Sequence, residues 1–469
     1  MPPEKSAYAL ARYSRSPDSI VQSLDWVRGH SSEKFLESFY FQYGHASIAD
    51  LGHCIFCFEG ISELAAVEIE DEPLWDGQAK SSRYQDFSKG EIVTPPEIVG
   101  TAAESVYNEA AQKLLAAYLE IHQRLVEHLA GQHPRPAEMK EGAYQRTIAA
   151  RAYDVARYLL FLGVSTNIGQ VTSIRTLEKQ MQRLGASVYG EVRELAAEMH
   201  EACAAPPACP WSGAEEPEPL APTLARYADP DLRSKQARDS VAEWAAGNLS
   251  LSPQRDVLDV DLTRPRDPLD EIAATLLYGA TDLPFRVLLD EVSTWSRERR
   301  REVLDAALIH RNRRDELLRE FRSGYAYIFD IVTDIGAYRD LHRHRRCQQV
   351  RQAFTDQLGY ETPALVREAG VSALYEEALG AARRARETLA SVSSGAAHYL
   401  LPFAARCRSL YKMDFAEAEY ISRVRSGVKG HISYRRVAWE MRERILEAEP
   451  DLGGLIHATS PDVEDVLTR

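Results

Sequence analysis

The sequence lacks several features that would place it in a common class of protein. No apolar run reaches 18 residues, and the N-terminal MPPEKSAYALARYSRS has no apolar core, so we expect a cytoplasmic protein without a membrane segment. The formal net charge of −14 argues against a broad surface for nucleic acid or membrane lipid. Neither G-x-G-x-x-G nor G-x-x-x-x-G-K-[ST] occurs, which argues against Rossmann and P-loop nucleotide binding.

Cysteine is also scarce, with 6 in 469 residues, which predicts reduced thiols rather than a disulfide scaffold. Cys54 and Cys57 form a single C-x-x-C inside the apolar stretch GHCIFCFEGIS. A zinc or redox site needs further ligands or a helix-opening context, so we interpret both as buried core residues. His342 and His344 stand among arginines that would repel a cation, and we predict no metal site.

The length and the internal pattern predict two globular units. A chain of 469 residues with 45% hydrophobic residues can bury more than one core. Long amphipathic helical patterns, strand-to-helix patterns and the phrases ARYLLFLGVSTN and AHYLLPFAARCR occur once in each half, in the same order. The matching segments are 45–68 with 324–342, 104–129 with 373–392, 156–167 with 397–408, and 173–199 with 414–441. The predicted fold is therefore α+β, in two tandem copies.

A proline-rich segment separates the copies. CAAPPACPWSGAEEPEPLAP (203–222) has no periodicity and is typical of a linker. We place the first copy at 1–204, the linker at 205–238 and the second copy at 239–469. The first copy is longer before its shared phrase, and we interpret GQHPRPAEMKEGAYQ (131–145) as an inserted loop. Two similar domains pack most simply about a pseudo-two-fold axis, so sites at their interface are expected.

One basic cluster stands out in this acidic chain. DLHRHRRCQQ (340–349) contains Arg343, His344, Arg345 and Arg346 in succession, directly after a segment that reads as buried. Most such charge runs are solvated helix ends. The alternative is an anion site, because arginine binds phosphate oxygens through two parallel hydrogen bonds and histidine adds a directional donor. Diphosphate would suit such a cluster, and the residue types alone leave both interpretations open.

The order of the motifs resembles that of the flavin-dependent thymidylate synthase family. A GHxS element, an apolar FEGIS segment, an Arg-His-Arg triplet, an S-x-R-Y element and a late YLLP segment with a distal arginine are distributed over both halves. The resemblance covers most of each half as one incomplete copy. It implies two tandem thymidylate-synthase-complementing-type domains, each with long helices packed on a small antiparallel sheet.

The resemblance also assigns roles to individual residues. It implies that FAD binds to Arg343, His344, Arg345, His45, Ser47 and Ser14, with Asp50 at the acidic position of the family. It implies that dUMP binds to Ser81, Arg83, Tyr84, Arg157, Arg183 and Arg425. The residues that would act in catalysis are Arg343, His344 and Ser81.

Each copy departs from the family pattern where the other copy keeps it. The acidic EIEDEPLWDG (68–77) replaces the triplet in the first copy, and Ala353 and Thr355 replace the S-x-R residues in the second. In this family the flavin side and the nucleotide side of a site come from different subunits of a tetramer. The resemblance therefore implies composite sites and a homodimer of this chain that mimics the tetramer.

The function implied by the resemblance is reductive methylation of dUMP to dTMP, with FAD as cofactor and NADPH and methylenetetrahydrofolate as co-substrates. Two alternatives stay open. The chain could be a related flavoenzyme for another nucleotide, since the acidic segment would change the charge of the cavity unless it is only a surface loop. It could also be a catalytically degenerate paralogue that binds nucleotide or flavin, or assembles with a complete synthase.

Overall fold

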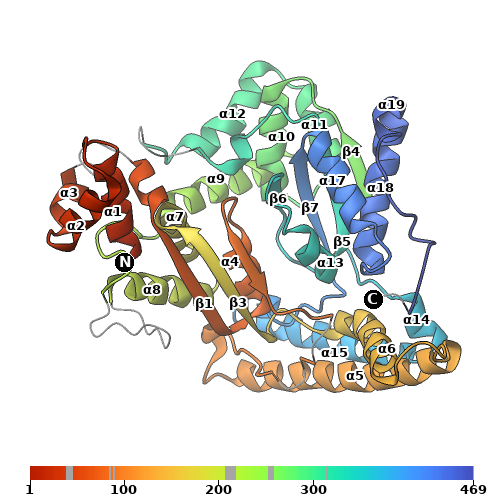
Figure 1. Ribbon diagram of the computed structural model, residues 1–469. Helices are drawn as coiled ribbons and strands as arrows, with labels where there is room; N and C mark the ends of the chain where they lie inside the picture. Colours follow the sequence, from red (N-terminus) through yellow and green to blue (C-terminus); the bar gives the residue numbers. More distant parts are fainter. Residues whose placement is uncertain are drawn as a thin grey trace. The chain divides into compact units, whose positions relative to one another are not determined.

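The computed structural model describes residues 1–38, 46–83, 86–87, 90–205, 218–251, 258–312, 315 and 317–467 (Figure 1). The chain forms two compact units. The first unit comprises Met1–Lys80, Pro95–Glu97 and Ser165–Leu232, and the second comprises Ser81–Thr94, Ile98–Val164 and Arg233–Arg469. These limits differ from those of the two sequence copies, whose boundaries stay a prediction.

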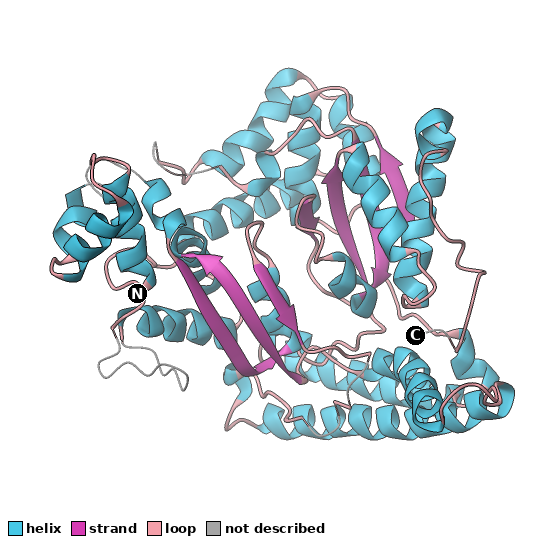
Figure 2. Cartoon of the chain, in the orientation of Figure 1, coloured by secondary structure: helices cyan, strands magenta, loops and turns pink. Residues whose placement is uncertain are grey.

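The first unit is built around a three-stranded antiparallel sheet in the order β1-β3-β2 (Figure 2). The central strand β3 pairs its Val171 with Ile55 of β1 and with Asp76 of β2. One face of the sheet packs on α4, α7 and α8, and buries Cys54, Phe58 and Ile168. The elements are α1 Pro3–Tyr13, α2 Ile20–Arg28, α3 Ser32–Leu36, η2 Ala46–Leu51, β1 His53–Ser62, α4 Glu63–Glu70, β2 Asp76–Ala79, β3 Ser165–Ser173, α7 Ile174–Gly185 and α8 Gly190–Ala204.

The second unit contains a four-stranded antiparallel sheet in the order β4-β5-β7-β6. Every residue of β5 is buried, because helices cover both faces of this sheet. The sheet elements are β4 Val260–Thr263, β5 Tyr327–Asp334, β6 Gln348–Arg351 and β7 Arg406–Met413. The covering helices are α9 Leu232–Asn248, α10 Pro268–Ala280, α11 Phe285–Ser293, α12 Arg297–Leu308, α13 Ile335–Leu341, α17 Phe415–Arg425, α18 Ile432–Ala448 and α19 Pro450–Gly453.

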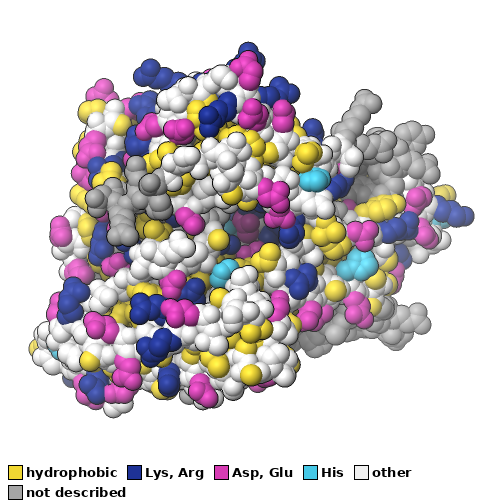
Figure 3. Space-filling view, turned by 180° about the vertical axis from the view of Figure 1, so that it is seen from behind, with side chains coloured by type: hydrophobic (Ala, Val, Ile, Leu, Met, Phe, Trp, Pro, Cys, Tyr) yellow, Lys and Arg dark blue, Asp and Glu magenta, His cyan; other side chains and the backbone are white. Residues whose placement is uncertain are grey.

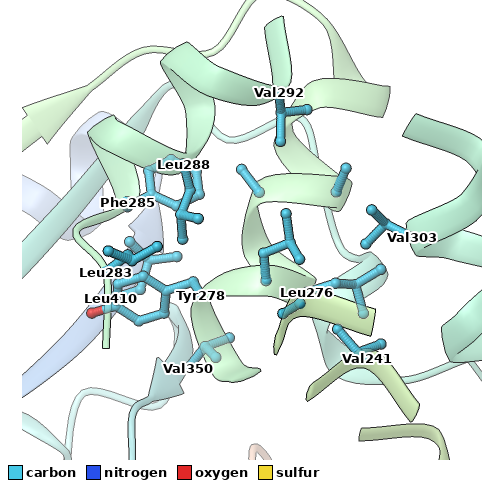
Figure 4. Close-up of a cluster of buried hydrophobic side chains, with 14 of the residues drawn as sticks. Val241, Leu276, Tyr278, Leu283, Phe285, Leu288, Val292, Val303, Val350 and Leu410 are labelled. Carbon is cyan, nitrogen blue, oxygen red and sulfur yellow. The ribbon is translucent and has the colours of Figure 1, made fainter. Parts of the chain in front are cut away.

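The two cores of this unit differ in the helices that form them. On one face of the sheet, Ile328, Val350 and Leu410 pack against α10, α11 and α12, and Figure 4 shows Tyr278 and Phe285 of this cluster close to Leu410. On the other face, side chains of α13, α17 and α18 pack against Phe329 and Ile331. The α+β fold with small antiparallel sheets is therefore confirmed.

Long helices from both halves of the sequence pack together in the second unit. Helix α5, Ala102–Gln132, lies against α15, Ser372–Ala390, as Figure 1 also shows. Nearby lie α6 Glu141–Ala156, η4 Arg157–Leu159, α14 Ala364–Glu368 and α16 Ser394–His398, whereas η5 Arg319–Phe321 packs on α10. No helix among the described residues is both long and apolar enough to cross a membrane.

The two shared phrases pair with each other. Leu162 donates its backbone N–H to Leu401 over 3.0 Å, and Phe403 donates to Leu160 over 2.6 Å. These bonds satisfy backbone groups of residues that are fully buried. The phrase that marks each half in the sequence is thus the point where the halves meet inside the second unit.

The halves share local hydrogen bonds as well as element order. Tyr107 of α5 donates its hydroxyl to the carbonyl of Val93 at 2.7 Å, and Tyr375 of α15 donates to Glu361 at 2.6 Å, across the same sequence separation. Helix α4, which follows β1, and helix α13, which follows β5, are both capped at the N-terminus by a side-chain oxygen. Ser62 caps α4 and donates to Glu191 of α8, whereas Asp334 caps α13 and accepts from Ser433 of α18.

In the first unit the capping residue Ser62 carries the hydroxyl and its partner Glu191 carries the carboxylate. In the second unit the capping residue Asp334 carries the carboxylate and its partner Ser433 carries the hydroxyl. A strand–helix junction needs an acceptor at the cap, because the first N–H groups of the helix have no partner within it. Either side chain meets that need, and a long-range partner then satisfies the buried oxygen.

Three sequence predictions are corrected by the structure. The segment 131–145 is not one loop, because α5 continues to Gln132 and α6 begins at Glu141. Cys57 is exposed, so it is not a core residue, whereas Cys54 is buried and its burial raises the pKa of its thiol to about 12. The acidic segment 68–77 is not merely a surface loop, because Trp75 is 2% exposed and donates its indole N–H to Gln170 at 2.6 Å.

Candidate functional site

Arg83 is buried in the second unit and joins elements from both halves of the sequence. Its Nε donates to Asp154 Oδ1 of α6 at 2.8 Å, its Nη1 donates to the Tyr434 hydroxyl of α18 at 2.8 Å, and its Nη2 donates to the Lys429 carbonyl at 2.9 Å. Bonds to three partners fix this guanidinium in place. Arg83 therefore holds the start of α18 against α6.

Arg157 lies one helical turn beyond Asp154, and its environment is quite different. The side chain is 2% exposed, yet its Nε and Nη2 have no hydrogen-bond partner among the described residues. An ion pair joins its Nη1 to Asp340 Oδ2 at 3.5 Å. A Cβ at Gly336 of α13 would lie 3.3 Å from Nη2, so the missing side chain leaves room for the guanidinium. Buried arginine donors are normally satisfied, and these two are available to an acceptor.

The carboxylate of Asp340 interacts electrostatically with four arginines. Burial alone would raise the pKa of this carboxyl, but the positive charges of Arg157, Arg343, Arg83 and Arg425, in that order, lower it. Asp340 is therefore ionised at neutral pH. We call Arg83, Arg157, Arg343 and Arg425 the arginine group, and two of its members come from each half of the sequence.

His344 and Arg425 form the second half of this site. Arg425 of α17 donates its Nε–H to His344 Nε2 at 2.7 Å, so that nitrogen carries the lone pair of the imidazole. His344 Nδ1 faces Glu417 Oε1 at 3.7 Å, and Glu417 and Arg425 share a face of α17 two turns apart. Burial lowers the pKa of His344 and the Arg425 charge acts in the same direction; together they outweigh the Glu417 carboxylate, which raises it, so the ring is neutral at pH 7.

The charges of the arginine group also affect the pKa values of other titratable residues around it. Burial raises the pKa of Asp334 and the charge of Arg157 opposes that rise, while Asp334 Oδ1 also accepts the N–H of Ala337 at 2.8 Å. Burial holds the pKa of His431 well below its usual value, with Arg157 and Arg83 acting in the same direction. His431 Nε2 lies 2.8 Å from the carbonyl oxygen of Asp154 and contributes no charge.

The structure brings together only part of the predicted site. Arg83, Arg157, Arg343, His344 and Arg425 are neighbours within the second unit. Half-buried Arg345 follows His344, and Ser81 Oγ accepts the Arg83 N–H at 3.4 Å. His45 and Tyr84 lie outside the described residues.

The remaining predicted residues belong to the first unit. Ser14 ends α1 and donates its hydroxyl to Ala11 at 2.8 Å, and Ser47 is exposed on η2. Asp50 accepts from Arg175 at 3.1 Å. Arg183, at the end of α7, donates to Glu72 at 2.8 Å and to the Glu68 carbonyl at 2.7 Å. Its positive charge is thus paired with the acidic segment that replaces the triplet.

Sequence reasoning missed several residues that shape the site. Asp154, Asp340, Glu417 and Tyr434 each contact a member of the arginine group or His344. The spacing of three between Asp154 and Arg157, and of three between Asp340 and Arg343, is a signal that each pair lies within one turn of the chain, although Arg343 follows the end of α13 at Leu341. Tyr434 left no such signal, because its partner lies 351 positions away.

The arrangement suits a ligand with an anionic group. Arg157 supplies N–H donors that have no partner among the described residues, in a buried position where a charge-assisted hydrogen bond is strong. Arg343 and half-buried Arg425 add positive charge, while Asp340 supplies only acceptors. On the face shown in Figure 3, basic and acidic side chains are interspersed, so the concentration of arginine around Asp340 is a local feature.

Comparison with known proteins places these features in a family. Residues 1–210 and 266–451 match the family described as thymidylate synthase complementing protein. A UPF0159 protein of Thermoplasma acidophilum is 25% identical over 486 residues, covering 95% of this chain and 93% of its own. A UPF0159 protein of Chlamydia muridarum is 25% identical over 430 residues, covering 87% and 77%.

Among solved structures, the flavin-dependent thymidylate synthase of Helicobacter pylori, complexed with FAD and dUMP, is 14% identical and covers 42% of this chain and 88% of its own, with a TM-score of 0.25. The family match extends over most of the sequence, on both sides of the proline-rich segment. The chain therefore belongs to the thymidylate synthase complementing protein family.

Proposed function

We propose that the chain is an FAD-dependent thymidylate synthase-like enzyme that methylates dUMP to dTMP at the arginine group. The family and the order of motifs support this reaction class. The observation that carries the proposal is Arg157, a guanidinium 2% exposed whose Nε and Nη2 have no partner among the described residues. A phosphate oxygen of a nucleotide would satisfy these donors.

The neighbouring residues suit the other parts of such a site. Arg343 and His344 would lie against the FAD diphosphate, and Ser81 would bind the nucleotide beside Arg83. Arg83 itself acts mainly by position, since Asp154, Tyr434 and Lys429 already engage its nitrogens. Bound FAD would supply the redox chemistry, with NADPH as reductant and methylenetetrahydrofolate as carbon donor.

The test is an absorbance spectrum of the purified chain after addition of FAD and removal of the excess, followed by titration with dUMP. We expect retained flavin and a spectrum that shifts with dUMP. Arg343→Ala should lose the flavin, whereas Arg286→Ala should retain it, because Arg286 pairs with Asp261 at 2.6 Å and is not part of the arginine group. A colourless wild-type protein would contradict the proposal.

A second candidate function is favoured by Asp340. An ionised carboxylate accepts hydrogen bonds only, so it suits the N3–H of uracil but also the amino group of cytosine. Competition between dUMP and dCMP for the flavin-loaded protein separates the two, and preference for dCMP would favour a flavoenzyme for another nucleotide. Flavin and dUMP binding without formation of dTMP would instead indicate a degenerate, nucleotide-binding paralogue.

A further inference from the structure

The first three helices of the chain have counterparts in the second half. Helices α2 and α11 are both 9 residues long, and Ser31 and Ser296 cap the helices that follow them. Tyr13 near the end of α1 precedes these elements by the same spacing as Tyr278 of α10. Helices α1 to α3 and α10 to α12 therefore begin at corresponding residues, although α12 has 12 residues where α3 has 5.

In the second unit these helices cover one face of the sheet. The Tyr278 hydroxyl donates to Asp330 Oδ1 of β5 at 3.0 Å, and the Phe285 N–H donates to Asp330 Oδ2 at 2.9 Å. Lys412 of β7 lies 3.4 Å from Thr275 Oγ1 of α10 and pairs with Glu271 at 2.5 Å. Beneath these contacts Ile328 and Leu410 are fully buried.

In the described part of the first unit, the same face of the sheet is exposed. Ile55 of β1 pairs with Val171 of β3, as Ile328 pairs with Lys412. Ile55 is 71% exposed and Val171 is 42% exposed, although both are apolar residues in the middle of a sheet. Cys57, which stands at the position of Asp330, is also exposed. We call Ile55, Cys57 and Val171 the open sheet face.

The matching face of α1 is exposed too. Leu10, at the position of Thr275, is 39% exposed, and Tyr13, at the position of Tyr278, is 49% exposed. The chain's own α1 is anchored by its opposite side, where Glu4 accepts the N–H groups of Thr223 at 2.7 Å and Leu224 at 2.9 Å. Both surfaces that form the contact in the second unit are therefore present in the first unit, where both are exposed.

The residue types favour the contact. The polar pair Thr275 and Lys412 of the second unit corresponds to the apolar pair Leu10 and Val171 in the first. Both members of the pair are apolar in the first unit, as both are polar in the second, so the two surfaces are complementary in each case. Apolar side chains on adjacent strands are stabilised when another element removes them from water.

We propose that the open sheet face binds the α1 helix of a second copy of this chain. Each copy then supplies one sheet face and one α1 surface, so two identical contacts form about a two-fold axis and the assembly closes as a dimer. Within each contact, the partner's Leu10 covers Val171 and the partner's Tyr13 covers Cys57. The proposal concerns the first unit and does not rest on the proposed reaction.

A disulfide tests the contact directly. The substitution Tyr13→Cys places a thiol opposite the native Cys57, at the pair that corresponds to Tyr278 and Asp330. After mild oxidation of the full-length chain, we expect a covalent dimer on non-reducing electrophoresis that disappears when Cys57→Ser is added. A disulfide between the introduced thiol and Cys57 of the same chain, identified by peptide mapping, would overturn the proposal, because it would show that the chain's own α1 covers the face. Absence of any Cys57-dependent disulfide would overturn it as well.

Sedimentation of single variants provides an independent measurement. Ile55→Asp should convert the dimer to monomer at micromolar concentration, because a carboxylate would be buried against the partner's α1. Leu74→Asp is the matched control, since Leu74 is 75% exposed in the same unit and lies outside the open sheet face. A monomeric wild-type chain, or equal behaviour of the two variants, would contradict the proposal.

Discussion

The sharpest prediction concerns Arg157, because the structure separates its role in binding from its role in stability. Arg157→Met keeps a long side chain at a site that is 2% exposed and removes a charge whose Nε and Nη2 have no partner among the described residues. Breaking an isolated buried ion pair costs ~3–5 kcal/mol, but Asp340, the ion-pair partner of Arg157, keeps the charges of Arg343, Arg83 and Arg425 after the substitution. The free energy of unfolding should therefore fall by less than ~3 kcal/mol.

The loss of binding follows from the same donors. If Arg157 binds the phosphate of dUMP, the substitution removes charge-assisted hydrogen bonds, each of which contributes ~1.5–3 kcal/mol. Since about 1.4 kcal/mol corresponds to a tenfold change in Kd, affinity for dUMP should fall at least ~10-fold. Isothermal titration calorimetry on the flavin-loaded protein measures this change, and differential scanning calorimetry measures the stability.

Arg435 is the matched control for this prediction. It is 1% exposed, but it donates to the carbonyls of Ser426, Ser460 and Val463 at 3.0, 3.2 and 2.8 Å. Arg435→Met removes all three charge-assisted hydrogen bonds, one of them to the carbonyl of fully buried Ser426, and should destabilise the chain by ~3 kcal/mol or more. If Arg157→Met destabilised the chain as much as Arg435→Met and left dUMP affinity unchanged, Arg157 would be a structural residue and the reasoning would fail.

Three further predictions concern the surroundings of the arginine group and the pH dependence of stability. Asp340→Asn should raise the affinity for inorganic phosphate, measured by calorimetry, because the arginines lose their internal counter-ion; unchanged affinity would mean that they are not accessible. Tyr434→Phe should lower the free energy of unfolding by ~1 kcal/mol in denaturant titration, since Arg83 Nη1 loses its 2.8 Å acceptor; no loss would contradict this bracing role. Burial and the charges of Arg386 and Arg351 lower the pKa of His398 from 6.5 to about 4, so the unfolded chain takes up this proton first and stability should fall by up to ~3 kcal/mol from pH 6.5 to 4; an equally steep profile in His398→Gln would exclude this histidine as the cause.

The sequence predicts local elements well, because the periodicity of a helix or strand is set by residues that are consecutive in the chain. The helical pattern at 104–129 corresponds to α5, Ala102–Gln132, and the pattern at 373–392 corresponds to α15, Ser372–Ala390. The loop interpretation of 131–145 failed for the same reason: proline and glycine at its start mask the helical pattern that resumes at Glu141. Periodicity shows where a segment is regular and does not show what it packs against.

Partners distant in sequence could not be predicted in this way. The exposure of Cys57 depends on whether a helix covers its sheet face, and the apolar run around it reads the same in either case. The role of Arg83 depends on Tyr434, 351 positions away, so the S-x-R motif identified the residue and not its bonds. Arg343, His344 and Arg425 were selected through a resemblance, whereas their convergence with Arg157 on Asp340 emerges only from the folded chain.

Arginines at the end of α7 in the first unit and at the end of α17 in the second have different partners, and this explains why the second position suits an anion. In the first unit the arginine at the end of α7, Arg183, is paired with Glu68 of α4 and with Glu72, which follows that helix. In the second unit the arginine at the end of α17, Arg425, donates to neutral His344, which follows α13. An arginine neutralised by carboxylates has little attraction left for a phosphate, whereas one bonded to a neutral imidazole retains its full charge. The acidic residues on and after α4 therefore disfavour an anion in the first unit, whereas in the second unit Arg157 from the first half adds its charge to the site proposed for one.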